Sequence, residues 1–157
     1  MGKMNFRRWL LAGLVAGVIS DILGYLIDGV WLAPYWRSGM QSLGLTGFAP
    51  SVWAWFNVLG VVSGLMAMWI YVAIRPRFGT SANTAFKAAM VAWVLSSLIP
   101  NLSFMVFGGF FSHQLAAYTT LGAFVQIVVG VMAGATLYKE GPAVPVAAVK
   151  VREAVQA

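Results

Sequence analysis

The stretch WLLAGLVAGVISDILGYLIDGVWL (residues 9–32) contains no lysine or arginine, and its only acids are Asp21 and Asp28. A run this long and this apolar is typical of a membrane-spanning helix, because an α-helix needs about 20 predominantly apolar residues to cross the hydrocarbon core. Basic residues before an apolar run also occur in cleaved signal peptides. Here the length of the run, its two acids and the lack of a small-residue cleavage site favour an uncleaved first span.

Three more apolar stretches of similar length follow, at residues 52–74, 85–110 and 117–138. Arg75-Pro76-Arg77-Phe78-Gly79 is expected to end the second, because proline and glycine break helices and arginines prefer the membrane interface. Pro100 is expected to kink the third. The composition agrees, since 61% of the chain is hydrophobic and only 9% is charged. A soluble domain carries about 25% charged residues, so a soluble enzyme is excluded.

These patterns predict an all-α integral membrane protein, a four-transmembrane-helix bundle over residues 1–140. Residues 141–157 are expected to form a cytoplasmic tail without ordered structure. A short helix on the membrane surface is expected near Trp36–Leu43, in the long connection between the first two spans. Aromatic residues beside polar ones are typical of the membrane interface.

The basic residues indicate the orientation. With four spans, both termini and the middle loop lie on one side of the membrane, and that side holds nine of the ten basic residues: Lys3, Arg7, Arg8, Arg75, Arg77, Lys87, Lys139, Lys150 and Arg152. Only Arg37 lies on the other side. Because basic loops stay in the cytoplasm, both termini are predicted to be cytoplasmic.

Small residues recur at helical spacing along the spans. Helices in lipid associate through small residues that permit close approach, so these stripes predict the inward faces. The candidate packing glycines are Gly13, Gly17 and Gly24 in the first span, Gly60 and Gly64 in the second, and Gly122, Gly130 and Gly134 in the fourth.

Polar residues lie on or beside these stripes at similar depths. At 1.5 Å per residue, they lie about 18–26 Å from the cytoplasmic ends of their spans. The predicted layer, a candidate ion or substrate site, consists of Asp21, Asn57, Ser97, Asn101 and Gln126. Asp28 lies nearer the outer surface, where either it is a solvated interfacial acid or Arg37 is its most available partner.

Asp21 is central to this layer, because it has no basic partner at its depth: Lys87, at the cytoplasmic end of the third span, is the one basic residue within the four predicted spans. Loss of water favours the neutral acid, hydrogen-bonded to amide or hydroxyl groups. Two interpretations remain open. Asp21 could fix helix register through interhelical hydrogen bonds, or it could bind or exchange a proton or cation, with Asn101, Gln126 and Ser97 supplying oxygens.

Other chemistry finds little support. The chain has no cysteine and one histidine, His113, so thiol chemistry and bis-histidine haem are excluded, although a single axial ligand stays open. No nucleophilic set, phosphate loop or metal-binding helix motif occurs. We therefore expect no catalytic residues, no metal and no cofactor. We also expect no nucleic-acid partner, because the distribution of the basic residues is explained by the orientation of the chain in the membrane.

The segment WIYVAIRPRFG (residues 69–79), with the Gly/Ala-rich start of the first span, resembles small four-span bacterial inner-membrane proteins over about residues 9–140. This resemblance implies the architecture and a bacterial inner membrane, with no activity. The chain is also similar to small multidrug transporters, which have four spans and an embedded acid in the first. The matching acid here is Asp21, an aspartate where that family has glutamate, and the outer connection is longer.

Two functions follow. The first is a non-enzymatic scaffold or accessory subunit that packs through small-residue helix faces. The alternative is a small oligomeric proton- or cation-coupled transporter that uses Asp21. The expected partners are the lipid bilayer and either further copies of the chain or a larger membrane complex.

Overall fold

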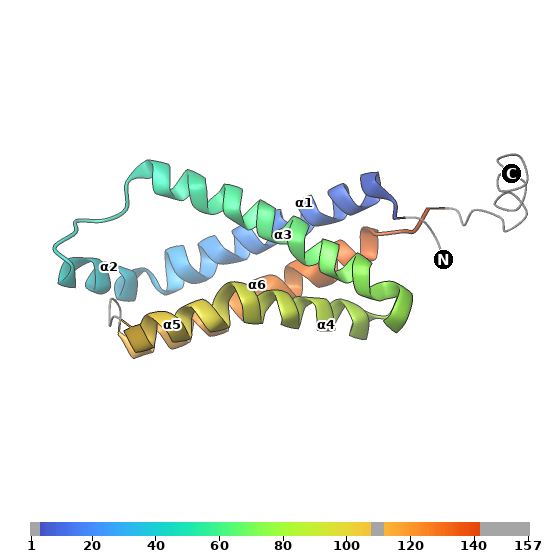
Figure 1. Ribbon diagram of the computed structural model, residues 1–157. Coiled ribbons are helices and arrows are strands. Elements are labelled where there is room, and N and C mark those ends of the chain that lie inside the picture. Colours follow the sequence, from blue (N-terminus) through green and yellow to red (C-terminus); the bar gives the residue numbers. More distant parts are fainter. Residues whose placement is uncertain (1–3, 108–111, 142–157) are drawn as a thin grey trace, which may run out of the picture.

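The computed structural model describes residues 4–107 and 112–141, and over these ranges the chain is helical with short connections (Figure 1). The predicted tail therefore lies almost wholly outside the described residues. The elements are α1 (Phe6–Gly24), the π-helical turn η1 (Tyr25–Trp31), α2 (Ala33–Ser42), α3 (Pro50–Phe78), α4 (Ala82–Trp93), the π-helical turn η2 (Val94–Leu98), α5 (Ile99–Phe107) and α6 (His113–Leu137).

Four helical segments are long and apolar enough to cross a membrane, which confirms the all-α class and the number of membrane-length helices within the described part. They are Phe6–Trp31, Pro50–Phe78, Ala82–Val106 and His113–Leu137. Three of them begin at a clear cap. The side chains of Asn5, Ser81 and Ser112 accept hydrogen bonds from backbone N–H groups three residues ahead, as N-cap residues do.

A proline removes one backbone donor, and near the end of a helix only one bond is lost, so α3 continues through Pro76 to Phe78. The helix stops at Gly79, inside the expected stop Arg75-Pro76-Arg77-Phe78-Gly79. This residue has φ of 81°, a left-handed conformation that glycine adopts without steric cost.

The two π-helical turns lie at the ends of α1 and α4. The turn η2 ends two residues before Pro100, which has no N–H for the carbonyl of Ser96. A kink was expected at Pro100, and the helix widens into this π-helical turn just before the proline. The turn η1 was not predicted, and its last bond runs from the N–H of Leu32 to the carbonyl of Ile27 at 2.8 Å.

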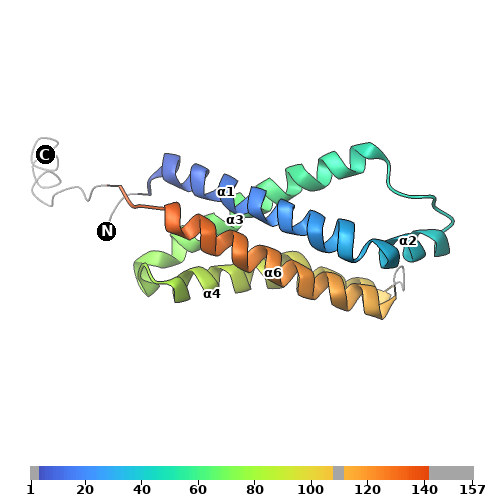
Figure 2. The same ribbon diagram turned by 180° about the vertical axis from the view of Figure 1, so that it is seen from behind.

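The helices pack unevenly along their length. Helix α1 lies between α3 and α6, and α4 packs against both α3 and α6 (Figures 1 and 2). The buried core gathers where α1 begins and α6 ends, which we call the chain-end half. Its residues are mostly small: Ala12, Ala16, Ala67, Met68, Tyr71, Ala85, Ala88, Ala89, Val131 and Tyr138. In the opposite half, which carries α2, α3 turns away from α5 (Figure 1).

Glycines allow the close approach of α1 to its neighbours. A Cβ on Gly17 would lie 2.6 Å from the Cα of Val61, and one on Gly134 would lie 2.6 Å from the carbonyl oxygen of Ala12. Each of the eight glycines in the predicted stripes has atoms of another helix of this chain within contact distance. These faces are therefore used inside the molecule.

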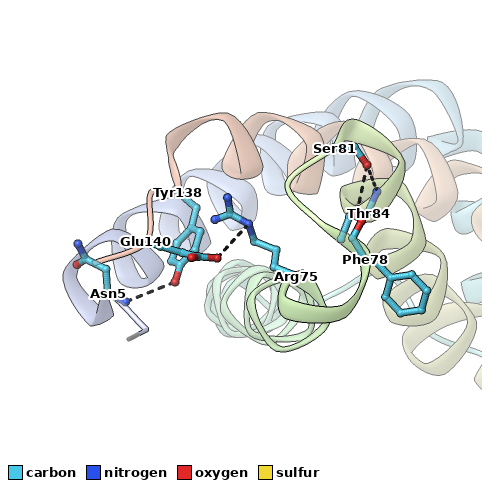
Figure 3. Close-up of polar contacts among 7 residues, drawn as sticks. All are labelled: Asn5, Arg75, Phe78, Ser81, Thr84, Tyr138 and Glu140. Carbon is cyan, nitrogen blue, oxygen red and sulfur yellow. Dashed lines mark hydrogen bonds and ion pairs between the residues drawn. The ribbon is translucent and has the colours of Figure 1, made fainter. Parts of the chain in front are cut away.

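Arg75 is a buried arginine in the chain-end half, where it contacts residues from the ends of two helices (Figure 3). The side chain of Arg75 is 8% exposed, and its guanidinium carbon lies 5.3 Å from the ring centre of Tyr71 and 4.9 Å from that of Tyr138. Its Nε lies 3.8 Å from Oε1 of Glu140, and the backbone N–H of Asn5 donates to the hydroxyl of Tyr138 at 3.4 Å. The start of α1, the end of α3 and the end of α6 are thereby joined.

Candidate functional site

A cavity of about 960 Å³ lies between α1, α3, α4–α5 and α6, and it extends from the core residues Ala16, Ala67 and Val131 to the α2 end. Helix α2 and the segment after it line its end farthest from the chain-end half (Figure 1). All five residues of the predicted polar layer line this one cavity: Asp21, Asn57, Ser97, Asn101 and Gln126. Their mutual contacts, however, differ from those expected.

Asp21 faces α3. Its carboxyl group lies directly against the Cα of Gly60, in the space that a Cβ at that position would fill. The residue is partly exposed, and no residue of the described chain forms a hydrogen bond or an ion pair with its carboxyl group. Gly60 makes room for the acid, and the acid has no protein partner there.

Gln126 was expected in one layer with Asp21, and the structure adds a bond from it to the other acid. Its Nε2 donates to Oδ2 of Asp28 at 2.9 Å, and its backbone carbonyl accepts from the hydroxyl of Ser20 at 3.0 Å. The amide side chain passes Gly24, where a Cβ would lie 3.3 Å from its Oε1. Glycine at position 24 thus gives Gln126 room along α1.

The partner expected for Asp28 is also different. The indole N–H of Trp36 donates to Oδ1 of Asp28 at 3.4 Å, and no ion pair joins Asp28 to Arg37 within the described residues. Two neutral donors therefore hold this carboxyl group. Asp21 and Asp28 are seven residues apart, which in a regular α-helix is nearly two turns and would place both on the same face. A π-helical turn contains more residues than an α-helical one, so this alignment is lost. Asp28, inside η1, therefore faces α6 while Asp21 faces α3.

Asn101 and Ser97 join the third span to α6. Nδ2 of Asn101 donates to Oγ1 of Thr120 at 2.7 Å and to Oγ of Ser97 at 3.4 Å. The indole N–H of Trp93 donates to the backbone carbonyl of Thr120 at 2.9 Å. Thr120 was not among the predicted residues, although a threonine inside an apolar span is a usual interhelical hydrogen-bond partner.

Asn57 remains apart from these pairs. Its Nδ2 donates to the backbone carbonyl of Trp53 on its own helix at 2.7 Å, and its side chain is exposed. The predicted layer is therefore one cavity wall with separate groups: Asp28 with Gln126, and Asn101 with Ser97. Asp21 and Asn57 belong to neither.

Aromatic rings line the α2 end of the cavity. The ring centre of Phe48 lies 6.0 Å from that of Trp36, 5.8 Å from that of Trp53 and 6.2 Å from that of Phe56. Such edge contacts are favourable between aromatic rings. Together with the aliphatic residues, they make the wall mostly apolar with a few polar groups, which is typical of ligand-binding cavities.

The charges in the lining are two acids and one base. Asp21 and Asp28 lie on α1 and η1, and Arg37 is an exposed residue of α2. No group of three or more histidine, aspartate or glutamate residues that could hold a metal ion occurs in residues 4–107 and 112–141. The inner wall therefore offers hydrogen-bond acceptors, which suit a proton, a cation or an N–H donor.

The fold and site define an all-helical protein, over the described residues, with four membrane-length helices and a partly open, acid-containing cavity. The chain matches no protein-family model, no curated protein and no solved structure.

Proposed function

We propose that this chain is a bacterial inner-membrane protein that moves a small cation or proton-coupled solute through the cavity at Asp21. In this proposal the four long helices form a transmembrane bundle, and both chain ends lie in the cytoplasm. The nine-to-one distribution of basic residues supports that orientation. Exposed leucine, valine and isoleucine side chains along the helices suit contact with lipid.

The proposal depends on where Asp21 lies and on which groups contact its carboxyl group. An ionisable residue within a membrane span is costly, and such residues usually face a cavity and mark a path for ions or substrates. Asp21 lines the cavity and has no hydrogen-bond partner in the described chain. If Asp21 acted only as a link between helices, its carboxyl group would have a partner, as that of Asp28 does.

The chemistry is an exchange at one carboxyl group. Without a bound cation, the neutral acid is the favourable form in an apolar cavity. A cation that enters can replace the proton, because the carboxylate then gains a charged partner. Asp28 differs, since the side-chain amide of Gln126 and the indole of Trp36 already donate to it.

Flux measurements in proteoliposomes test the proposal. With a pH gradient imposed, the wild-type protein should carry protons or a monovalent cation, and Asp21→Asn should abolish this flux. Glu140→Gln is the matched control, because it also removes an acid but lies outside the cavity. Absence of flux in the wild type, or full flux in Asp21→Asn, would contradict the proposal.

The scaffold or accessory subunit, suggested by the small-residue faces, stays as the alternative prediction. The glycines on which it rested contact other helices of this chain, so a partner protein would bind the outer, apolar faces instead. Purification of the native protein in mild detergent tests this alternative. A stoichiometric partner, together with no flux, would favour it.

A further inference from the structure

The guanidinium of Arg75 is a buried charge whose N–H groups are not fully used. Its Nε and Nη1 are buried, and neither forms a hydrogen bond within the described part of the chain. Its ion-pair partner Glu140 lies 3.8 Å from Nε, which is beyond hydrogen-bond distance. The rings of Tyr71 and Tyr138 attract the charge but supply no oxygen acceptor to these two nitrogens. Since buried donors are costly unless they are hydrogen-bonded, the guanidinium is suited to donate to an oxygen anion.

The position of Glu140 shows that an anion can approach this arginine. Glu140 follows the end of α6 at Leu137 and lies outside any helix. Its side chain is 40% exposed, and its carboxylate lies beside the guanidinium (Figure 3). Exposed ion pairs are weak, so another anion that reaches the same place can replace this carboxylate.

Positive charge dominates this end of the molecule. The start of α1, the turn between α3 and α4 and the end of α6 lie together there (Figures 1 and 2). Within residues 4–8, 72–92 and 134–141, Glu140 is the one acid. The basic residues in these ranges are Arg7, Arg8, Arg75, Arg77, Lys87 and Lys139, and all except Arg75 are exposed. Their combined field attracts anions to this end of the bundle.

Arg75 lies near the depth of the lipid phosphates when the long helices span a bilayer. From Pro50 to Arg75, α3 rises about 38 Å, whereas the hydrocarbon core is about 30 Å thick. Apolar side chains at the same end are exposed: Phe6 is 63% exposed, Trp69 is 53% exposed and Phe78 is 48% exposed. These side chains suit contact with acyl chains. A phospholipid can therefore place its phosphate at Arg75 and its acyl chains beside the helices.

We propose that Arg75 binds the phosphate of an anionic phospholipid, which replaces Glu140 at the guanidinium. The planar guanidinium suits a phosphate group, because it can donate two parallel N–H bonds to two of its oxygens. Basic sites between transmembrane helices bind anionic head groups in this way. A zwitterionic lipid is disfavoured, since the neighbouring basic residues repel its cationic group. This inference goes beyond the proposed function, because Arg75 lies outside the cavity and its site requires a bilayer but no flux.

Native mass spectrometry of the protein purified in mild detergent measures the binding of the first lipid molecule. Dioleoyl-phosphatidylglycerol is the anionic probe, and dioleoyl-phosphatidylcholine is the zwitterionic probe with the same acyl chains. The wild type should bind phosphatidylglycerol at least about tenfold more tightly than phosphatidylcholine. Inorganic phosphate, compared with chloride at equal ionic strength, should compete poorly because it has no acyl chains. Effective competition by inorganic phosphate would overturn the lipid assignment in favour of a free phosphate ion.

Three charge variants locate the site. Arg75→Gln should weaken the binding of phosphatidylglycerol at least about tenfold. Arg77→Gln is the matched control, because it removes the same charge from an exposed position of the same helix, and it should weaken binding about twofold at most. Glu140→Gln should strengthen binding about threefold, because the competing carboxylate is gone. Opposite effects of Arg75→Gln and Glu140→Gln cannot come from a loss of stability, since both variants break the same ion pair.

Several results would overturn the inference. Equal binding of the two lipids would do so, and equal losses in Arg75→Gln and Arg77→Gln would indicate a diffuse basic surface instead. Unchanged or weaker binding in Glu140→Gln would contradict the exchange at the guanidinium. If Arg75→Gln does not unfold cooperatively, Arg75→Lys takes its place. That variant keeps the charge but loses the paired donation, so wild-type binding by it would also contradict the proposal. Absence of flux, which would contradict the proposed function, leaves every one of these lipid measurements valid.

Discussion

The carboxyl group of Asp21 on α1 and the Cα of Gly60 on α3 are in direct contact, and the acid fills the place that a side chain at position 60 would take. Gly60→Ala should therefore push the carboxyl group out of its position and weaken cation binding at least about tenfold, or about 1.4 kcal/mol. Binding of propylamine in nanodiscs checks this result. Ser63→Ala, which changes the cavity wall on the same helix, should bind normally. Normal binding by Gly60→Ala would show that the position of Asp21 is unimportant.

Gly64→Ala should act on stability instead of binding. A Cβ on Gly64 would meet the backbone of Gly17 on α1, and a backbone cannot move aside as a side chain does. Overpacking of this kind costs roughly 1–3 kcal/mol. Thermal unfolding in detergent should show a lower midpoint for Gly64→Ala than for Gly60→Ala. The reverse order would mean that the α1–α3 crossing differs from the one described.

Gln126→Leu should destabilise the protein by about 1 kcal/mol, because it removes the hydrogen bond to Asp28 from α6, and interhelical bonds in membranes contribute about 0.6–2 kcal/mol. A double-mutant cycle with Asp28→Asn, followed by unfolding in a denaturing detergent, measures the coupling. Gln114→Leu is the control on the same helix, since Gln114 is exposed and bonds only to Tyr118. Zero coupling between positions 28 and 126 would disprove the pairing.

The hydrogen bond between Asn101 and Thr120 should likewise stabilise the packing of the third span against α6. Thr120→Val removes an acceptor 2.7 Å from Nδ2 of Asn101 and keeps the shape of the side chain. A loss of about 0.6–1.7 kcal/mol is expected, with no further loss when Asn101→Leu is added. Ser103→Ala serves as the control, because Ser103 is exposed and bonds to Ile99 of its own helix. A larger loss at position 103 would contradict the assignment.

The stability that Arg75 contributes should come more from its contacts with two tyrosine rings than from its ion pair with Glu140. The guanidinium is buried between Tyr71 and Tyr138, and a desolvated cation–π contact contributes about 2 kcal/mol. Glu140 is 40% exposed and 3.8 Å away, and an exposed ion pair contributes about 0–1 kcal/mol. Arg75→Ala should therefore lower the unfolding temperature clearly, and Glu140→Gln only slightly. Equal effects would assign the stability to the ion pair.

The class of fold could be predicted from the sequence because the length and apolarity of a run are local properties. Four runs predicted four membrane-length helices, and the stop expected at residues 75–79 contains the end of α3. One hydrogen bond lost at Pro76 matters little near a helix end, and Gly79 determines where α3 stops.

The pairing of polar residues could not be predicted in the same way. Depth follows from counting residues, and the five residues assigned to one layer do line one cavity. The direction in which each side chain points depends on rotation about the helix axis, which the π-helical turn η1 changes between Asp21 and Asp28. The spacing of the small and polar residues does not mark such a turn. The hydrogen bond between Gln126 and Asp28 was therefore not predicted.

The hydrogen bond between Asp28 and Gln126 joins residues 98 positions apart, and that between Ser20 and Gln126 joins residues 106 apart. Translation runs from the first helix to the last, so α1 is made long before the residue that pairs with its acid. The polar side chains of Ser20 and Asp28 therefore reach these partners only after α6 has been made.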